Sequence, residues 1–341
     1  HEKADWPFLI RFHCIAPDAH TAYPIDAMIQ HIRQALALIH PDGISTIASA
    51  GELIEQGKFL LEQQPMDAIP LFERAAEIEA YSSEPWHYLS MALAGAARYD
   101  EALLAIDCAL GLVVNDCALW TMKGDILYEL GRYREALAAY DHSLVLMPAQ
   151  ADVWRNKADI LTRLEWHWDA AEAYQQALTL DPDNVALWQA QGNVLHYLWR
   201  NTKAVLAFDR ALTLDPDNPS LWIAKGDALR WLCQHQDALL AYDRAIALDP
   251  DGVDAWQGKA GSLYWLRRYN EALDICRQAI ELLPGGAELW FLKGDILIRQ
   301  DRFQEAVIAY GRAVALDPDS ELRREMPAEI RLMFDVDSQQ I

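Results

Sequence analysis

Histidine and cysteine are among the residue types of this chain that could act as metal ligands, nucleophiles or general bases. His13, Cys14 and His20 lie closest together, but their spacing matches no common zinc pattern. Three further histidines recur at long intervals without a carboxylate and a nucleophile beside them as a set: His167, His196 and His235. The five cysteines form no CxxC pair, and an odd number cannot all pair within one chain. We therefore predict no metal site, no cofactor and no disulfide framework, which fits a cytoplasmic protein.

Other function classes are excluded by motif and charge. None of the strings GxxxxGK[ST], GxGxxG, GxSxG or HExxH occurs, so we predict that the chain is not an enzyme. The formal net charge of -22 repels a phosphate backbone, and we expect no nucleic-acid partner. No stretch reaches the roughly 18 apolar residues of a membrane span, so no membrane partner is expected either. The chain begins at His1 rather than at methionine, and we expect a piece of a longer protein.

Tryptophan marks a regular interval along the chain, although it fills only 13 of the 341 positions. Seven tryptophans are spaced 34 residues apart: Trp86, Trp120, Trp154, Trp188, Trp222, Trp256 and Trp290. We number each 34-residue unit so that this tryptophan is position 4, and the units then start at residues 83, 117, 151, 185, 219, 253 and 287. Position 20 is alanine in every unit, position 8 is glycine, alanine or serine, and position 32 is proline in all units but the first. Such self-similarity is the sequence signature of a repeat architecture.

Each unit has the pattern of two amphipathic helices. Apolar positions 4, 8 and 11 share one face of the first helix, and positions 20, 24 and 27 share one face of the second. Small residues at positions 8 and 20 let the two axes approach to roughly 8 to 10 Å, and we expect the large ring at position 4 or 24 to fill the gap beside them. Asp-Pro steps such as Asp181-Pro182 end the second helix, and Asn184 or Asn218 can cap the next first helix.

This pattern resembles the tetratricopeptide repeat over residues 83–320. The resemblance implies an all-α fold, a right-handed α-α superhelical solenoid of tandem helix hairpins. We interpret residues 49–82 as a degenerate repeat and residues 321–341 as a capping helix and tail. Residues 1–48 do not follow the period, and they pattern as a short strand from Phe8 to Cys14 and then a helix. Either the strand belongs to the end of a preceding domain or it is an extended arm on the first repeats.

Positions 2, 5, 9, 12 and 13 share the face of the first helix opposite the tryptophan, and we call this the groove face. The resemblance implies that it lines a concave groove for a partner. The predicted partner-binding residues on it are Asp125, Tyr128, Arg155, Asp159, Arg163, Gln189, Asn193, His196, Tyr197, Asp227, Arg230, Trp231, Gln257, Tyr264, Trp265 and Asp295. Over the seven units these positions hold nine acidic residues and four arginines, so we expect a basic or neutral segment held by aromatic and arginine anchors. The alternative is that each position-9 carboxylate is merely solvated.

Five tryptophans outside the ladder fall in the middle units, and we call them the aromatic strip: Trp166, Trp168, Trp199, Trp231 and Trp265. The units starting at 151, 185 and 219 lack the aromatic residue that most others carry at position 17, and have His167, Asn201 and His235 there. The tryptophans either repack that void or form a contact surface along one edge.

These observations favour a scaffold or adaptor that binds a protein or peptide segment along the groove. The alternative is the regulatory or sensor part of a larger enzyme, such as a protease, nucleotide hydrolase or glycosyltransferase. A third hypothesis is self-assembly into a homo-oligomer through the repeat ends or the aromatic strip.

Overall fold

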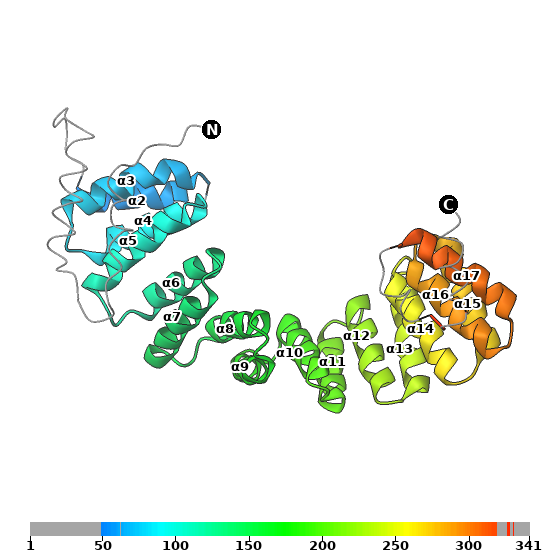
Figure 1. Ribbon diagram of the computed structural model, residues 1–341. Coiled ribbons are helices and arrows are strands. Elements are labelled where there is room, and N and C mark those ends of the chain that lie inside the picture. The colour runs from blue at the N-terminus through cyan, green and yellow to red at the C-terminus, as the bar shows by residue number, and fades with distance from the viewer. Residues whose placement is uncertain (1–48, 62, 319–325, 328–329, 331–341) are drawn as a thin grey trace. The chain divides into compact units, whose positions relative to one another are not determined.

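The structure is a computed structural model that describes residues 49–61, 63–318, 326–327 and 330 (Figure 1). The predicted strand from Phe8 to Cys14 and the helix after it lie outside these residues. In the described part the regular secondary structure is helical and consists of sixteen helices, α2 to α17. The chain divides into two compact units, residues 1–153 and 154–341, which are described separately.

The first unit holds three helix hairpins and the start of α8 (Ala151–Arg163). Its helices are α2 (Ala50–Leu61), α3 (Pro65–Ile78), α4 (Ser83–Gly95), α5 (Tyr99–Leu112), α6 (Cys117–Glu129) and α7 (Tyr133–Leu146). Helix α2 packs on α3, α4 on α5 and α6 on α7, and each hairpin contacts the next through α3 with α4 and α5 with α6. The hairpins therefore stack in chain order, and each buries its apolar face against its neighbours.

The second unit continues the same arrangement. Its helices after α8 are α9 (His167–Leu180), α10 (Val185–Tyr197), α11 (Asn201–Leu214), α12 (Pro219–Trp231), α13 (His235–Leu248), α14 (Val253–Trp265), α15 (Tyr269–Leu282), α16 (Ala287–Arg299) and α17 (Phe303–Leu316). The first helices of successive repeats also touch each other, α10 with α12, α12 with α14 and α14 with α16. Their groove faces thus lie side by side. Met326 and Ile330, from the segment predicted to cap the last repeat, are buried in the same core cluster as Tyr310.

The ring at position 24 fills the gap that the small residue at position 8 leaves. A Cβ atom at Gly124 would lie 2.4 Å from Cε1 of Tyr140, and one at Gly192 would lie 2.5 Å from Cε1 of Phe208. Both rings are buried, with 1% of their surface exposed. The predicted match between a small position 8 and a large position 24 is confirmed.

The ladder tryptophans do not fill that gap. Each of Trp120, Trp188 and Trp222 is partly exposed, and Trp256 is buried. In all four the indole N–H donates to the carbonyl oxygen six residues earlier, at position 32 of the preceding unit, over 2.8 Å. These four tryptophans therefore have equivalent surroundings, and each is hydrogen-bonded to the loop before its helix rather than filling the gap inside a hairpin.

Polar contacts also join successive repeats. The Lys225 ammonium lies 5.3 Å from the ring centroid of Trp222 and 2.6 Å from the carboxylate of Asp209 in the preceding repeat. At the helix starts, the side chain of Asn184 accepts a hydrogen bond from the backbone of Leu187, as predicted. The predicted cap by Asn218 is wrong, because its side chain accepts no hydrogen bond from the start of α12; its amide donates to Asp215, as that of Asn184 does to Asp181.

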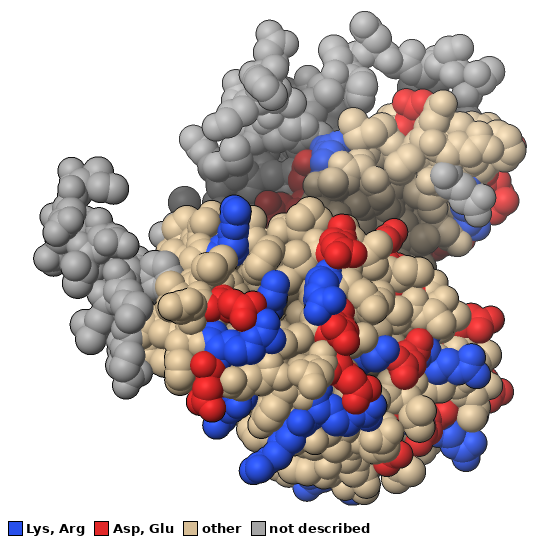
Figure 2. Space-filling view, turned by 90° about the vertical axis from the view of Figure 1, so that its right-hand side faces the viewer, with Lys and Arg blue, Asp and Glu red and all other residues tan. Residues whose placement is uncertain are grey.

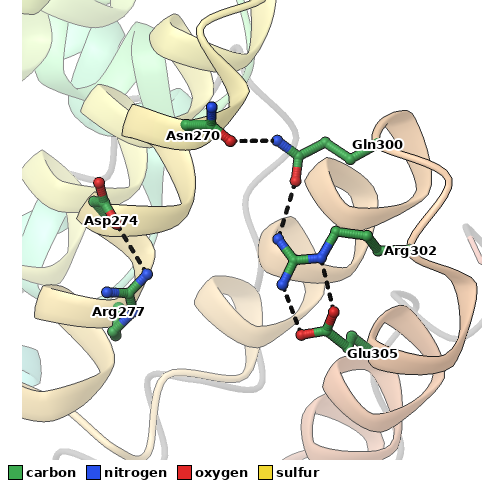
Figure 3. Close-up of polar contacts among 6 residues, drawn as sticks. All are labelled: Asn270, Asp274, Arg277, Gln300, Arg302 and Glu305. Carbon is green, nitrogen blue, oxygen red and sulfur yellow. Dashed lines mark hydrogen bonds and ion pairs between the residues drawn. The ribbon is translucent and has the colours of Figure 1, made fainter.

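The turn inside each repeat has a left-handed residue at position 15. The φ angle there lies between 58° and 71° in all seven units, yet the residue is glycine only in one, Gly131. Four turns also carry an arginine at position 16 paired with a glutamate at position 19, as Arg302 and Glu305 are (Figure 3). In that turn Gln300 accepts from Arg302 and donates to Asn270 of the preceding repeat over 2.9 Å (Figure 3).

Candidate functional site

Three neighbouring first helices, α12, α14 and α16, enclose a hollow of 370 Å³ on the groove face. Five predicted residues line it: Arg230, Gln257, Tyr264, Trp265 and Asp295. Its wall is completed by Gly261, Glu288, Phe291 and Leu292. Residues of positions 5, 9, 12 and 13 on three helices therefore meet at one place, as their spacing predicts.

Two further hollows adjoin this one. A hollow of 240 Å³ lies between α12 and α14 and is lined in part by Asp227, Arg230 and Asp254. A hollow of 430 Å³ lies between the starts of α14 and α16 and is lined in part by Asp254 and Glu288. Gln257 lines all three hollows, so its amide stands at their junction.

Arg230 owes its place in the hollow to a missing side chain. A Cβ atom on Gly261 would lie 3.1 Å from Nη1 of Arg230, so glycine at this position 9 leaves room for the guanidinium. Another guanidinium nitrogen of Arg230, Nη2, lies 3.5 Å from Oδ1 of Asp227 on the same helix. Arg230 was predicted as a site residue but Gly261 was not. The sequence signal for Gly261 is an arginine at position 12 of one unit followed by a glycine at position 9 of the next.

Aromatic side chains form the apolar wall. The rings of Tyr264 and Trp265 meet edge to face with centroids 5.7 Å apart. The Tyr264 hydroxyl accepts a hydrogen bond of 2.7 Å from Nε of Arg299. His235 stacks on Trp265 with an interplanar angle of 8°. Burial lowers the pKa of His235, and the Arg230 charge lowers it further, so the imidazole is neutral at pH 7.

The four aspartates at position 9 link the two helices of their own repeats. In four repeats the tyrosine hydroxyl at position 24 donates to this carboxylate over 2.5 to 2.7 Å: Tyr140 to Asp125, Tyr174 to Asp159, Tyr242 to Asp227 and Tyr310 to Asp295. Burial, and then the aspartate, raises the pKa of Tyr174 and Tyr310. The alternative of a merely solvated carboxylate is therefore wrong for these four residues.

The remaining predicted residues lie on earlier first helices. Tyr128 on α6 packs near Tyr133, with ring centroids 5.7 Å apart. Arg155 and Arg163 lie on α8, the first half-buried and the second exposed. Gln189, Asn193, His196 and Tyr197 lie on α10, where His196 Nδ1 is 2.6 Å from the side-chain oxygen of Asn201.

The aromatic strip is exposed to solvent. Its five tryptophans keep between 45% and 69% of their surface accessible. Trp199 and Trp231 touch edge to face across two repeats, with centroids 4.8 Å apart. The guanidinium of Arg200 lies 4.1 Å from the ring centroid of Trp168. The contact surface along one edge stays a prediction, and the exposure of these rings is compatible with it.

Part of the position-17 void is nevertheless covered by rings at position 13 of the next repeat. Tyr197 packs on His167 with centroids 3.9 Å apart, and Trp265 lies over His235. Both ring nitrogens of His167 are buried without a hydrogen-bond partner among the described residues. Of the five tryptophans, Trp265 thus covers a position-17 residue as the first explanation predicts, and the contact surface stays a prediction.

Other chemistry finds little support in the described residues. They contain no group of three or more histidine, cysteine, aspartate or glutamate side chains able to hold a metal ion. No helix of the part described is long and apolar enough to cross a membrane. Basic and acidic side chains intermingle on the face drawn in Figure 2, without a large patch of one sign.

Stacked two-helix units with an open, side-chain-lined face define a helical-repeat protein. Two family models, both described as tetratricopeptide repeat, match the chain, one at residues 121–185, 169–219, 189–252 and 223–287 and the other at residues 287–320. Together they cover residues 121–320, which is more than half of the sequence. The chain belongs to the tetratricopeptide repeat family, and its all-α fold agrees with this.

Similar solved structures have the same fold. The C-terminal part of a TPR repeat-containing protein from Cytophaga hutchinsonii is 17% identical with a TM-score of 0.58, over 69% of this chain and 96% of that one. A tetratricopeptide repeat protein from Parabacteroides merdae is 17% identical with a TM-score of 0.52, over 73% and 98%. YrrB, a TPR protein with an unusual peptide-binding site, is 21% identical with a TM-score of 0.50, over 54% and 95%. No curated protein matches the sequence.

Proposed function

We propose that this chain is a protein-interaction scaffold that binds a segment of a partner protein along the groove faces of its first helices. The observation that carries the proposal is the hollow between α12, α14 and α16, where charged, amide and aromatic side chains from three repeats converge. Tetratricopeptide repeats act as binding scaffolds rather than as catalysts, and a convergent polar and aromatic hollow suits recognition of a peptide.

The partner we propose is a basic or neutral segment. Four carboxylates and one arginine line the three hollows, so the surface attracts positive charge. The aromatic strip reaches this site through Trp265, and we propose that its exposed rings anchor the same partner. Buried aromatic and arginine contacts carry most of the binding energy at protein interfaces.

Selection from a displayed random-peptide library tests the groove. We expect peptides selected on the native protein to lose at least tenfold in affinity when Arg230 and Gln257 are both replaced by alanine, because each lines two or more hollows. The matched control is Arg244→Ala, which removes an exposed arginine from the second helix α13. If the selected peptides bind the double variant as tightly as they bind the Arg244→Ala control, the binding surface lies elsewhere.

The anchor role of the strip has its own test. Replacing Trp231 and Trp265 by alanine should weaken binding of the same peptides about tenfold or more without unfolding the protein. The two side chains are 54% and 64% exposed, so their removal opens little core. Leu240→Ala, at a leucine that is 61% exposed on α13, is the control for loss of an exposed apolar side chain. Unchanged affinity in the double tryptophan variant would remove the strip from the proposal.

A further inference from the structure

The three hollows on α12, α14 and α16 share their lining residues and so form one continuous surface. Gln257 belongs to all three, Arg230 to two of them, and Asp254 and Glu288 to two each. One side of this surface is carboxylate and the other is aromatic. Its two sides therefore suit two different side chains of one bound segment.

The carboxylate side is formed by Asp254 and Glu288, each in the first turn of its helix. Both are exposed, and neither side chain makes an ion pair or a hydrogen bond within the described part of the chain. The other two carboxylates of the surface, Asp227 and Asp295, each accept a tyrosine hydroxyl, and Arg230 lies beside Asp227. Asp254 and Glu288 are thus the carboxylates of this surface that are left open to a cationic side chain of a ligand.

The aromatic side consists of Tyr264, Trp265 and Phe291 around the hollow of 370 Å³. Phe291 is 7% exposed and forms the floor, while Trp265 is 64% exposed and forms the rim. His235 behind Trp265 has a lowered pKa through burial and adds no positive charge at neutral pH. This half of the surface accepts an apolar or aromatic side chain.

Gln257 between the two sides suits a peptide backbone. Its amide carries two N–H donors and a carbonyl acceptor, and it has no hydrogen-bond partner among the described residues. An extended segment offers free backbone C=O and N–H groups that one glutamine amide can satisfy together.

From this arrangement we infer that the surface around Gln257 binds an extended peptide segment with a lysine or arginine directed at Asp254 and Glu288 and an apolar or aromatic residue directed at Tyr264, Trp265 and Phe291. The inference rests on the proposed function and specifies the partner of the same groove. An acidic segment is disfavoured, because its carboxylates would meet those of Asp254 and Glu288.

Fluorescence anisotropy with three labelled peptides tests the inference. Each peptide has a Gly/Ser frame and one leucine. The three differ only at one position near the leucine, which is arginine in the first peptide, norleucine in the second and glutamate in the third. We expect the arginine peptide to bind about tenfold more tightly than the norleucine peptide, the glutamate peptide to bind most weakly, and the preference to shrink as salt is added.

The variant Asp254→Asn/Glu288→Gln should abolish the preference for arginine while leaving the affinity for the norleucine peptide unchanged. The control Asp237→Asn/Glu281→Gln removes two exposed carboxylates from second helices, one of them also in a first turn, and should leave the preference intact. A preference that survives the first variant, or no binding of the arginine peptide at about 1 mM, overturns the inference.

The proposed function can survive that result. If library peptides need Arg230 and Gln257 but show no enrichment of lysine or arginine, the groove binds segments and only the inferred chemistry is wrong. If no selected peptide responds to those two residues, the proposed function itself fails.

Discussion

The hydrogen bond between Tyr242 and Asp227 links the second helix of a repeat to its groove face, and its removal tests how the repeat is held together. Tyr242 is fully buried, and its hydroxyl donates over 2.7 Å to Oδ1 of Asp227, whose side chain is 36% exposed. A hydrogen bond to a charged acceptor contributes roughly 1.5 to 3 kcal/mol. Because water can reach the carboxylate once the hydroxyl is gone, we expect Tyr242→Phe to lower the free energy of unfolding by about 1 to 2 kcal/mol.

A double-mutant cycle isolates the pair. Asp227→Ala leaves the buried hydroxyl without its acceptor and should cost about 1 to 3 kcal/mol, and the double variant should cost less than the sum by about 1 kcal/mol. The Asp227→Ala variant and the double variant both lack the contact of Asp227 with Arg230. The contribution of that contact therefore cancels in the coupling energy.

Urea unfolding followed by circular dichroism gives the four free energies. Asp183→Ala, at an exposed loop aspartate, is the control and should change the free energy of unfolding by less than about 0.5 kcal/mol. A coupling energy below about 0.3 kcal/mol would show that the two side chains act independently, and the structural role assigned to the position-9 aspartates would then be refuted.

Three further outcomes follow from the packing. Gly226→Leu should lower the melting temperature sharply, because a Cβ there would already lie 2.7 Å from a buried ring, whereas Gly51→Ala, with nothing within 4 Å, should be neutral or stabilising. Burial raises the pKa of Cys276 to about 12, so this thiol stays protonated at pH 8. Mass spectrometry should therefore find iodoacetamide on the exposed Cys233 first, and equal labelling of both cysteines in the folded protein would contradict the burial of Cys276. Trp199→Gly should stabilise the protein by about 1 kcal/mol in thermal unfolding, because φ is 60° at this residue, and a loss of stability would contradict this expectation. The same variant should bind peptides more weakly.

The periodicity of the sequence was sufficient to predict the hairpins and their core. Alanine at position 20 recurs because this residue is fully buried in every repeat, and glycine recurs at position 8 where the ring at position 24 packs against it, as Gly124 and Tyr140 show. The role of the tryptophans was predicted less well. Their spacing shows that they are equivalent, but the indole N–H of Trp120, Trp188, Trp222 and Trp256 donates to a backbone carbonyl, and a backbone carbonyl does not depend on residue type.

Five of the nine residues that line the main hollow were predicted from helical spacing, but its internal bonds were not. Helical spacing alone places Arg230, Gln257 and Tyr264 on one face, and they line one hollow. The tyrosine-aspartate bonds were missed although the sequence carries their signal. Aspartate stands at position 9 only in units with tyrosine at position 24, whereas the unit with Phe208 has Asn193. This pairing appears only when position 9 of the first helix is compared with position 24 of the second helix in the same unit.

The turns of the middle repeats lack the stabilising arginine-glutamate pair and carry exposed tryptophans. Outer repeats hold this turn with an arginine-glutamate pair such as Arg132 with Glu135, worth up to about 1 kcal/mol when partly exposed. The unit starting at 185 has Arg200 and Lys203 at those positions, and places Trp199 in a left-handed conformation that costs a bulky residue about 1 kcal/mol or more.

Packing does not account for that cost, because Trp199 remains 69% exposed and touches Trp231 only by its edge. Five other units also have a left-handed residue other than glycine at position 15, so the backbone strain alone does not mark a binding site; what distinguishes Trp199 is its large exposed ring. The strip begins at Trp166, in the first unit without the arginine-glutamate pair, and reaches the groove at Trp265. A turn optimised for stability alone would have glycine at position 15, as the unit with Gly131 does.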